Sequence, residues 1–142
     1  MTIEESFREK RADGRALLVP YLTGGLGEWR ATIEEVAAAG ADAIEIGIPF
    51  SDPIMDGPVI QESSQRALRD GATPSGLVAE LSRVDVGVPL VVMTYYNPVH
   101  HLGHTRFADA LAAAGVSGSI VPDLPVDESD PWIDAAEAAG VE

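Results

Sequence analysis

Segments of strand length alternate with segments of helix length along most of this chain. The expected strands lie at 16–22, 43–48, 88–94 and 116–121. The expected helices lie at 28–39, 59–69, 74–84, 106–114 and 131–139. Because strands that alternate with helices are joined by right-handed crossovers, this order predicts an α/β fold with a parallel sheet that is covered on both faces.

Glycines at the ends of the expected helices support the same fold. Gly40, Gly71, Gly115 and Gly140 each follow a helical segment, at the position where glycine takes the left-handed conformation that ends a helix. Four strands with their helices make up half of a closed (β/α)8 barrel of ~250 residues, or a small open α/β sheet. We expect residues 1–142 to form a single domain, with the start of a fifth strand after Gly140.

The composition excludes several classes of function. The chain has 9 Lys and Arg against 23 Asp and Glu, a net charge of −14, and 46% hydrophobic residues, which predicts a packed core rather than disorder. An acidic field repels nucleic acid and anionic lipid. No apolar run approaches the ~20 residues of a membrane span, and the N-terminus is acidic where a signal peptide is basic, so we expect a cytoplasmic protein.

Cysteine and histidine usage argues against a metal site. The chain has no Cys, which excludes a disulfide framework, a thiolate zinc site, an iron–sulfur cluster and a cysteine nucleophile. His100, His101 and His104 lie within five positions, and we expect an exposed loop cluster there rather than metal ligands.

The acidity itself has three interpretations. It is a surface tuned for solubility, an adaptation to a salt-rich cytoplasm, or a binding face for a cationic partner. Only one basic residue is a lysine, Lys10, and the other eight are Arg. Because the carboxylates are spread along the chain rather than clustered, salt adaptation is the interpretation that we favour.

The most informative stretch begins in the second expected strand. Its period-2 pattern places Ile44, Ile46 and Ile48 on one face and Glu45 on the other, toward the interior of a barrel. Desolvation there should raise the pKa of Glu45 above ~4.3, toward that of a group that both gives and takes a proton near neutrality. The alternative is a structural Glu that backbone donors or water satisfy.

An acidic, proline-rich loop follows this strand. It spans 49–58 and carries Asp52 and Asp56, and such a loop at the carboxyl end of a strand is typical of a functional site. Asp52 has an alternative role as a turn or cap residue. For Asp56, which Gly57 and Pro58 follow before a helix, the alternative is helix capping.

At this point the motifs identify a family. The stretch IEIGIPFSDPIMDGPVIQ at 44–61 resembles the signature of the tryptophan synthase alpha chain family. The segments LLVPYLTGG, VPLVVMTYYNPV and VSGSIVPDLPVDES are similar to its first, third and fourth strand regions, in the right order. The resemblance covers the chain from about Ala16 onward and implies the first four β/α units, a half-barrel, of a (β/α)8 TIM barrel.

The resemblance also implies an activity in tryptophan biosynthesis. The family cleaves indole-3-glycerol phosphate to indole and glyceraldehyde 3-phosphate in a retro-aldol lyase reaction. The indole then passes to a beta chain in an alpha2beta2 complex. The beta chain carries pyridoxal phosphate, so this chain is expected to hold no cofactor and no metal.

Carried over position by position, the resemblance assigns roles to particular residues. Glu45 and Asp56 match the catalytic carboxylates: Glu45 for the two proton transfers, and Asp56 as acceptor for the indole N–H. Asp52 and Pro53 lie in the loop that communicates with the beta chain. The positions that match the substrate pocket are Tyr21, where the family usually has Phe, and Ile60, Met93, Tyr95, Asn97 and Asp123. Core packing is the alternative for the two tyrosines, Met93 and Ile60.

The length of the chain limits what it is expected to do alone. In such barrels the loops after strands seven and eight hold the substrate phosphate, and 142 residues do not include them. We therefore expect the isolated chain to be inactive. The alternative to an enzyme is a non-catalytic half-barrel that docks on a beta chain or associates with itself. Another phosphate-binding barrel with a carboxylate base is a third option, which the 44–53 segment argues against.

Overall fold

The fold is a four-stranded parallel sheet with helices between the strands. A computed structural model describes residues 2–142, and within them the sheet has the order β1-β2-β3-β4. Its strands are β1 (Tyr21–Thr23), β2 (Ile44–Gly47), β3 (Leu90–Met93) and β4 (Gly118–Ile120). Its helices are α1 (Ile3–Ala12), α2 (Trp29–Ala38), α3 (Pro58–Arg69), α4 (Pro74–Leu81), α5 (Tyr96–Leu102), α6 (His104–Ala113) and α7 (Asp130–Ala139), with a 3₁₀ turn η1 (Val126–Glu128).

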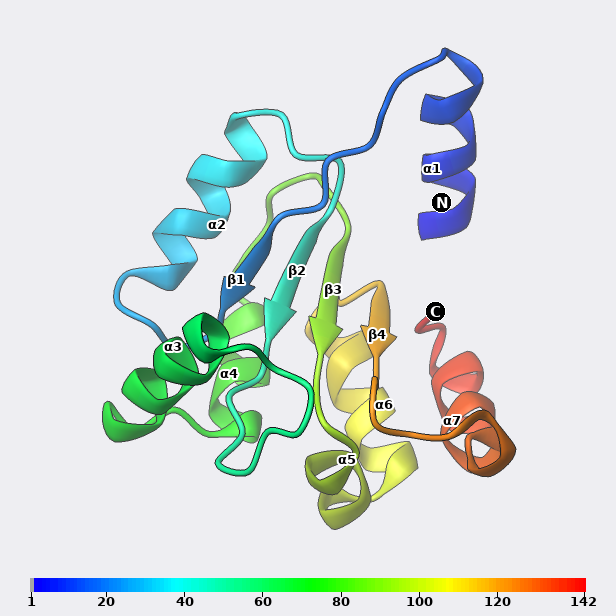
Figure 1. The fold of residues 1–142 in the computed structure, drawn as a ribbon. Coiled ribbons are helices and arrows are strands. Elements are labelled where there is room, and N and C mark those ends of the chain that lie inside the picture. The colour runs from blue at the N-terminus through cyan, green and yellow to red at the C-terminus, as the bar shows by residue number, and fades with distance from the viewer. Residues whose placement is uncertain (1) are drawn as a thin grey trace.

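All four arrowheads point the same way in Figure 1, which confirms the predicted parallel sheet. The core lies between the outer face of the sheet and its covering helices, with Ile46, Val92, Phe107 and Leu111 almost fully buried. The 49–57 loop and α5 lie at the carboxyl ends of the strands, and α1 lies toward the opposite end of the molecule (Figure 1). The carboxyl ends of β2 and β3 thus carry the segments that the sequence marks as functional.

The four predicted glycine stops are confirmed by the backbone. Gly40, Gly71, Gly115 and Gly140 all have positive φ, between +73° and +102°. A β-carbon is strained in that conformation, which is why glycine follows these helices.

The first strand differs most from its prediction. The apolar run at 16–22 predicts a long strand, but β1 begins at Tyr21, and the side chain of Leu18 is 60% exposed. The reason is a hydrogen bond to a residue that is distant in sequence, together with a proline. The Leu18 N–H donates to the Asp42 carboxylate at 2.9 Å, and Pro20 has no N–H to give to a ladder. The other strands are shortened at both ends.

Two helices have no counterpart in the predicted elements. The first, α1, is mostly polar apart from Ile3, Phe7 and Ala12, and none of its residues is buried. The second, α5, contains Pro98 in its first turn, where proline is tolerated although it suggests a loop. Because α5 and α6 carry His100, His101 and His104, the expectation of a loop cluster is wrong.

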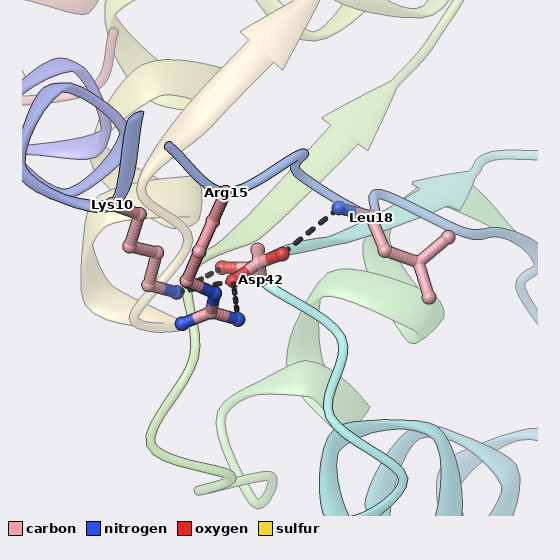
Figure 2. Close-up of polar contacts among 4 residues, drawn as sticks. All are labelled: Lys10, Arg15, Leu18 and Asp42. Carbon is pink, nitrogen blue, oxygen red and sulfur yellow. Dashed lines mark hydrogen bonds and ion pairs between the residues drawn. The ribbon is translucent and has the colours of Figure 1, made fainter. Parts of the chain in front are cut away.

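Two carboxylates attach the N-terminal helix to the rest of the chain: Asp42, and Glu142, which accepts from the N–H groups of Ile3 and Glu4. Asp42, just before β2, accepts from Lys10 Nζ at 2.9 Å, from Arg15 at 3.4 Å and from the Leu18 N–H at 2.9 Å. Figure 2 shows these three groups converging on the two oxygens of Asp42. Lys10 lies in α1, so the only lysine of the chain joins this helix to β2.

Beyond α7 the backbone runs along β4. The Glu142 N–H donates to the Ser117 carbonyl at 3.0 Å, and the Glu142 carbonyl accepts from the Ser119 N–H at 2.7 Å. One residue that bonds to two residues on either side of its partner in the next strand is the hydrogen-bond pattern of parallel strands. It is in keeping with the expected start of a fifth strand after Gly140.

Candidate active site

The sheet register places Tyr21 and Glu45 side by side. Tyr21 pairs with Glu45, and Glu45 pairs with Val91, so the three side chains leave the same face of the sheet. Their neighbours Ile46 and Val92 leave the opposite face and are fully buried in the core. Glu45 therefore faces away from the helix-covered core, as its period-2 pattern predicts.

Burial raises the pKa of the Glu45 carboxyl above its ordinary value. Within residues 2–142 its side chain forms no hydrogen bond and no ion pair that would hold the charged form. No backbone or side-chain donor within these residues satisfies the Glu45 carboxylate. A half-buried carboxyl without a partner holds its proton closer to neutrality, which suits it for proton transfer.

Tyr21 lies over a glycine in the neighbouring strand. A β-carbon at Gly47 would overlap the Tyr21 hydroxyl, so only glycine leaves room for this ring. Burial raises the pKa of Tyr21, and the charges of Asp56 and Glu45 raise it further. The phenol therefore stays protonated beside both carboxylates. Sequence reasoning missed Gly47, although a glycine inside an apolar strand is the signal of such a close approach.

The loop after β2 brings Asp56 to this face. Asp56 is half-buried, and its carbonyl accepts from Gln61 Nε2 at 2.8 Å. Gly57 is the N-cap residue of α3, and no side chain caps this helix, so the capping alternative for Asp56 is wrong. Asp52 is exposed and accepts from the Ser51 hydroxyl at 2.6 Å, while Pro53 is half-buried.

Tyr95 joins the loop to the end of β3. Its side chain is 1% exposed, and its hydroxyl accepts from the N–H groups of Met55 at 3.0 Å and Asp56 at 3.1 Å. The ring of Phe50 stacks on it with centroids 5.4 Å apart. Sequence reasoning treats Tyr95 only as a pocket wall and does not single out Phe50, because no local pattern marks either contact.

The remaining predicted pocket residues are spread more widely. Met93 pairs with Gly47, so it leaves the same face of the sheet, and it is buried. Ile60 is half-buried in α3, and Asn97 is exposed on α5. Asp123, after β4, accepts from the Tyr96 N–H at 2.8 Å. The structure thus brings Tyr21, Glu45 and Asp56 together and leaves Asn97 on the surface.

The histidines form an aromatic cluster. His104 Nε2 lies 2.8 Å from the Tyr96 hydroxyl, and the ring of His100 lies 5.7 Å from that of Tyr96. Across residues 2–142, no three His, Cys, Asp or Glu side chains are grouped to hold a metal ion.

Two apolar grooves lie away from the carboxylates. One, of about 310 Å³, separates α4 from α6, and the other, of about 610 Å³, lies between β4 and α7. Neither is lined by Tyr21, Glu45 or Asp56. No helix in the described part of the chain is long and apolar enough to cross a membrane.

Known proteins match this chain in sequence and fold. A sequence model described as tryptophan synthase alpha chain matches residues 7–142. The chain belongs to the tryptophan synthase alpha chain family. It is 45% identical to the alpha chain of Thermobifida fusca over 144 aligned residues, covering 99% of this chain and 53% of that protein. The chain therefore spans about half the length of this curated relative.

Solved tryptophan synthases have the same fold over the matched part. One from M. tuberculosis superposes with a TM-score of 0.92 at 39% identity, over 98% of this chain and 57% of that one. Another, from the alpha2beta2 complex of Pyrococcus furiosus, has a TM-score of 0.81 at 38% identity, and the match covers 89% of this chain and 54% of that one. The four β/α units are thus part of the family's TIM barrel. The family cleaves indole-3-glycerol phosphate in tryptophan biosynthesis without a cofactor, since pyridoxal phosphate is on the beta chain.

Proposed function

We propose that this chain supplies the catalytic carboxylates of an indole-3-glycerol phosphate lyase. The observation that carries the proposal is the position of Glu45. It leaves the sheet face away from the helix-covered core, beside Tyr21, and its pKa is raised by burial without any partner in residues 2–142. A carboxyl with a raised pKa donates a proton and takes it back at a pH closer to neutral than an exposed carboxyl does.

The retro-aldol cleavage requires three events. The indole ring is protonated at C3, the glycerol hydroxyl that becomes the aldehyde loses its proton, and the positive charge that develops at the ring N–H is stabilised. We assign the two proton transfers to Glu45. Asp56, as a charged acceptor, stabilises the ring N–H. The protonated Tyr21 phenol lies beside both carboxylates and forms part of the indole pocket.

Further pocket residues follow from their positions. Met93 leaves the same face as Gly47, and Ile60 is half-buried on α3, so both are proposed as apolar contacts of the indole. Tyr95, Asn97 and Asp123 complete the proposed substrate site at the ends of β3 and β4.

The proposed partner is a beta chain in an alpha2beta2 complex. Asp52, exposed in the loop after β2, and its neighbour Pro53 are the proposed contacts. The solved structure from P. furiosus is of such a complex. We propose that residues 1–142 form one domain and that the protein acts in the cytoplasm.

A second function is proposed for the 142 residues on their own, which we expect to be a non-catalytic half-barrel. In the described residues β1 is an edge strand of the sheet, β4 is paired on its outer side only by Glu142, and the Ile120 side chain on β4 is 43% exposed. Open edges and exposed apolar side chains favour association with a beta chain or with a second copy. Sedimentation together with an indole-release assay distinguishes this from a monomer that releases indole.

The test of the lyase uses a completed barrel. The chain is joined to the C-terminal part of the T. fusca alpha chain, and indole release from indole-3-glycerol phosphate is measured. Glu45→Gln should lower kcat by about 10²–10⁴, the loss expected for an acid–base group, and Asp56→Asn should lower it by about 10²–10³, the loss expected for one group that stabilises developing charge. Glu62→Gln, an exposed carboxylate on α3, is the matched control and should have no effect. Near-normal turnover by Glu45→Gln would refute its role.

A further inference from the structure

Two side chains connect the three loops that follow β2, β3 and β4. Tyr95, after β3, receives two hydrogen bonds from the loop after β2. Asp123, after β4, receives one from the Tyr96 N–H after β3. The connected residues are 27 to 40 positions apart in the chain, so packing of the sheet rather than local sequence brings them together.

The contact of Tyr95 with the loop has two components. The Phe50 ring stacks on the Tyr95 ring, which places the start of the loop. The N–H groups of Met55 and Asp56 both donate to the Tyr95 hydroxyl, which places its end. A phenolic oxygen that accepts twice has only its own proton left to donate.

This contact restrains the main chain that carries the Asp56 carboxylate. The loop at 49–57 contains neither helix nor strand, so its position depends on such individual contacts. One of the two N–H groups that donate to the Tyr95 hydroxyl belongs to Asp56 itself. The Asp56 carbonyl accepts from the side chain of Gln61. The backbone on both sides of the Asp56 Cα is therefore restrained.

Asp123 restrains Tyr95 in turn. Helix α5 begins at Tyr96, immediately after Tyr95, and the first N–H groups of a helix have no partner within it. The Asp123 carboxylate accepts one of them at 2.8 Å. A negative charge at a helix N-terminus is also favourable. The backbone next to Tyr95 is thus fixed from β4.

A pocket wall alone does not require these hydrogen bonds. An apolar wall needs the ring of Tyr95 but not its hydroxyl, and the ring is 1% exposed, covered in part by Phe50. We propose that Tyr95 is a positioning residue for Asp56, and that Asp123 holds Tyr95 in place. The catalytic meaning of this arrangement rests on the function proposed above, but the arrangement itself is tested without turnover.

The test compares two neighbouring tyrosines in the 142-residue chain. Amide hydrogen exchange is followed by NMR in Tyr95→Phe and in the matched control Tyr96→Phe, whose hydroxyl contacts His104 instead of the loop. Tyr95→Phe should raise the exchange rates of the Met55 and Asp56 amides at least about tenfold and change the carboxyl ¹³C shift of Asp56. Amides in β2 and β3 should be unaffected, and Tyr96→Phe should leave the loop unchanged.

Two substitutions at Asp123 test the second step. Asp123→Ala removes the acceptor and should also speed exchange of the Met55 and Asp56 amides. Asp123→Asn keeps an acceptor oxygen and should restore most of the protection. The proposal is overturned if Tyr95→Phe leaves loop exchange unchanged, or if it accelerates every amide in the sheet equally. Neither result bears on the lyase assignment, which depends on turnover by the Glu45 and Asp56 variants.

Discussion

Glu45 lies on a strand where a carboxylate is energetically unfavourable. Burial raises its pKa in the folded chain above the value of ~4.3 in the unfolded chain. The folded state therefore binds this proton more tightly than the unfolded state does. By linkage, protonated Glu45 contributes fully to the stability of the fold below its unfolded pKa. This contribution is lost as the pH rises through its folded pKa.

This linkage predicts the effect of removing the charge. Glu45→Gln should raise Tm at pH 7 by about 2 °C, because a desolvated charge is replaced by a neutral amide of the same shape. At pH 3, below the unfolded pKa of ~4.3 and the raised folded pKa, Glu45 is protonated in both states and the difference should disappear. Thermal unfolding followed by circular dichroism at the two pH values measures it, with the exposed Glu62→Gln as control. A lower Tm for Glu45→Gln at pH 7 would contradict the burial argument.

At the scale of elements, α1 depends on a contact far from it in sequence. No residue of this helix is buried, so it contributes little to the apolar core. Its attachment includes the ion pair between Lys10 and Asp42. The Leu18 N–H and then Lys10 and Arg15 hold the pKa of Asp42 below its usual value. The ionised Asp42 carboxylate therefore stabilises the fold at pH values above its unfolded pKa of ~3.9. This stabilisation is lost as the pH falls through its folded pKa.

Asp42→Asn should therefore destabilise the chain at neutral pH. The amide still accepts from Leu18, but Lys10 and Arg15 lose their counter-charge, and Tm should fall by several degrees at pH 7. The difference should shrink below pH ~4, as Asp42 of the wild type becomes protonated. Calorimetry at pH 7 and pH 3 provides the measurement. Asp109→Asn, an exposed carboxylate on α6, is the control, and equal losses in both variants would rule out the ion pair as the cause.

At the scale of the whole molecule, the net charge of −14 is the dominant feature. Repulsion among so many carboxylates disfavours a compact state. Salt screens this repulsion, because the Debye length falls from ~10 Å at 0.1 M salt to ~3 Å at 1 M. We expect Tm to be several degrees higher in 1 M KCl than in 0.1 M. Sucrose at equal osmolality is the control for excluded-solute effects. A Tm that does not change with KCl would remove the salt-adaptation hypothesis.

The local pattern of the sequence determines the order and type of most elements. The alternation of strands and helices, the glycines that end four helices and the outward direction of Ile44, Ile46 and Ile48 are all confirmed. These features depend on residues only a few positions apart, because a helix or strand repeats its side-chain directions every 3.6 or 2 residues. The interior direction of Glu45 follows from the same periodicity.

Only the tertiary structure decides which loops meet and where strands end. β1 starts at Tyr21 because the Leu18 N–H bonds to Asp42, 24 positions away. Tyr95 holds the Asp56 loop across 39 positions, and the alternative of a capping role for Asp56 is wrong because Gly57 occupies the N-cap position. Such contacts are selected when the sheet packs against its helices. The periodicity of a segment specifies which face is buried, but it does not specify which distant backbone N–H a buried hydroxyl or carboxylate will accept.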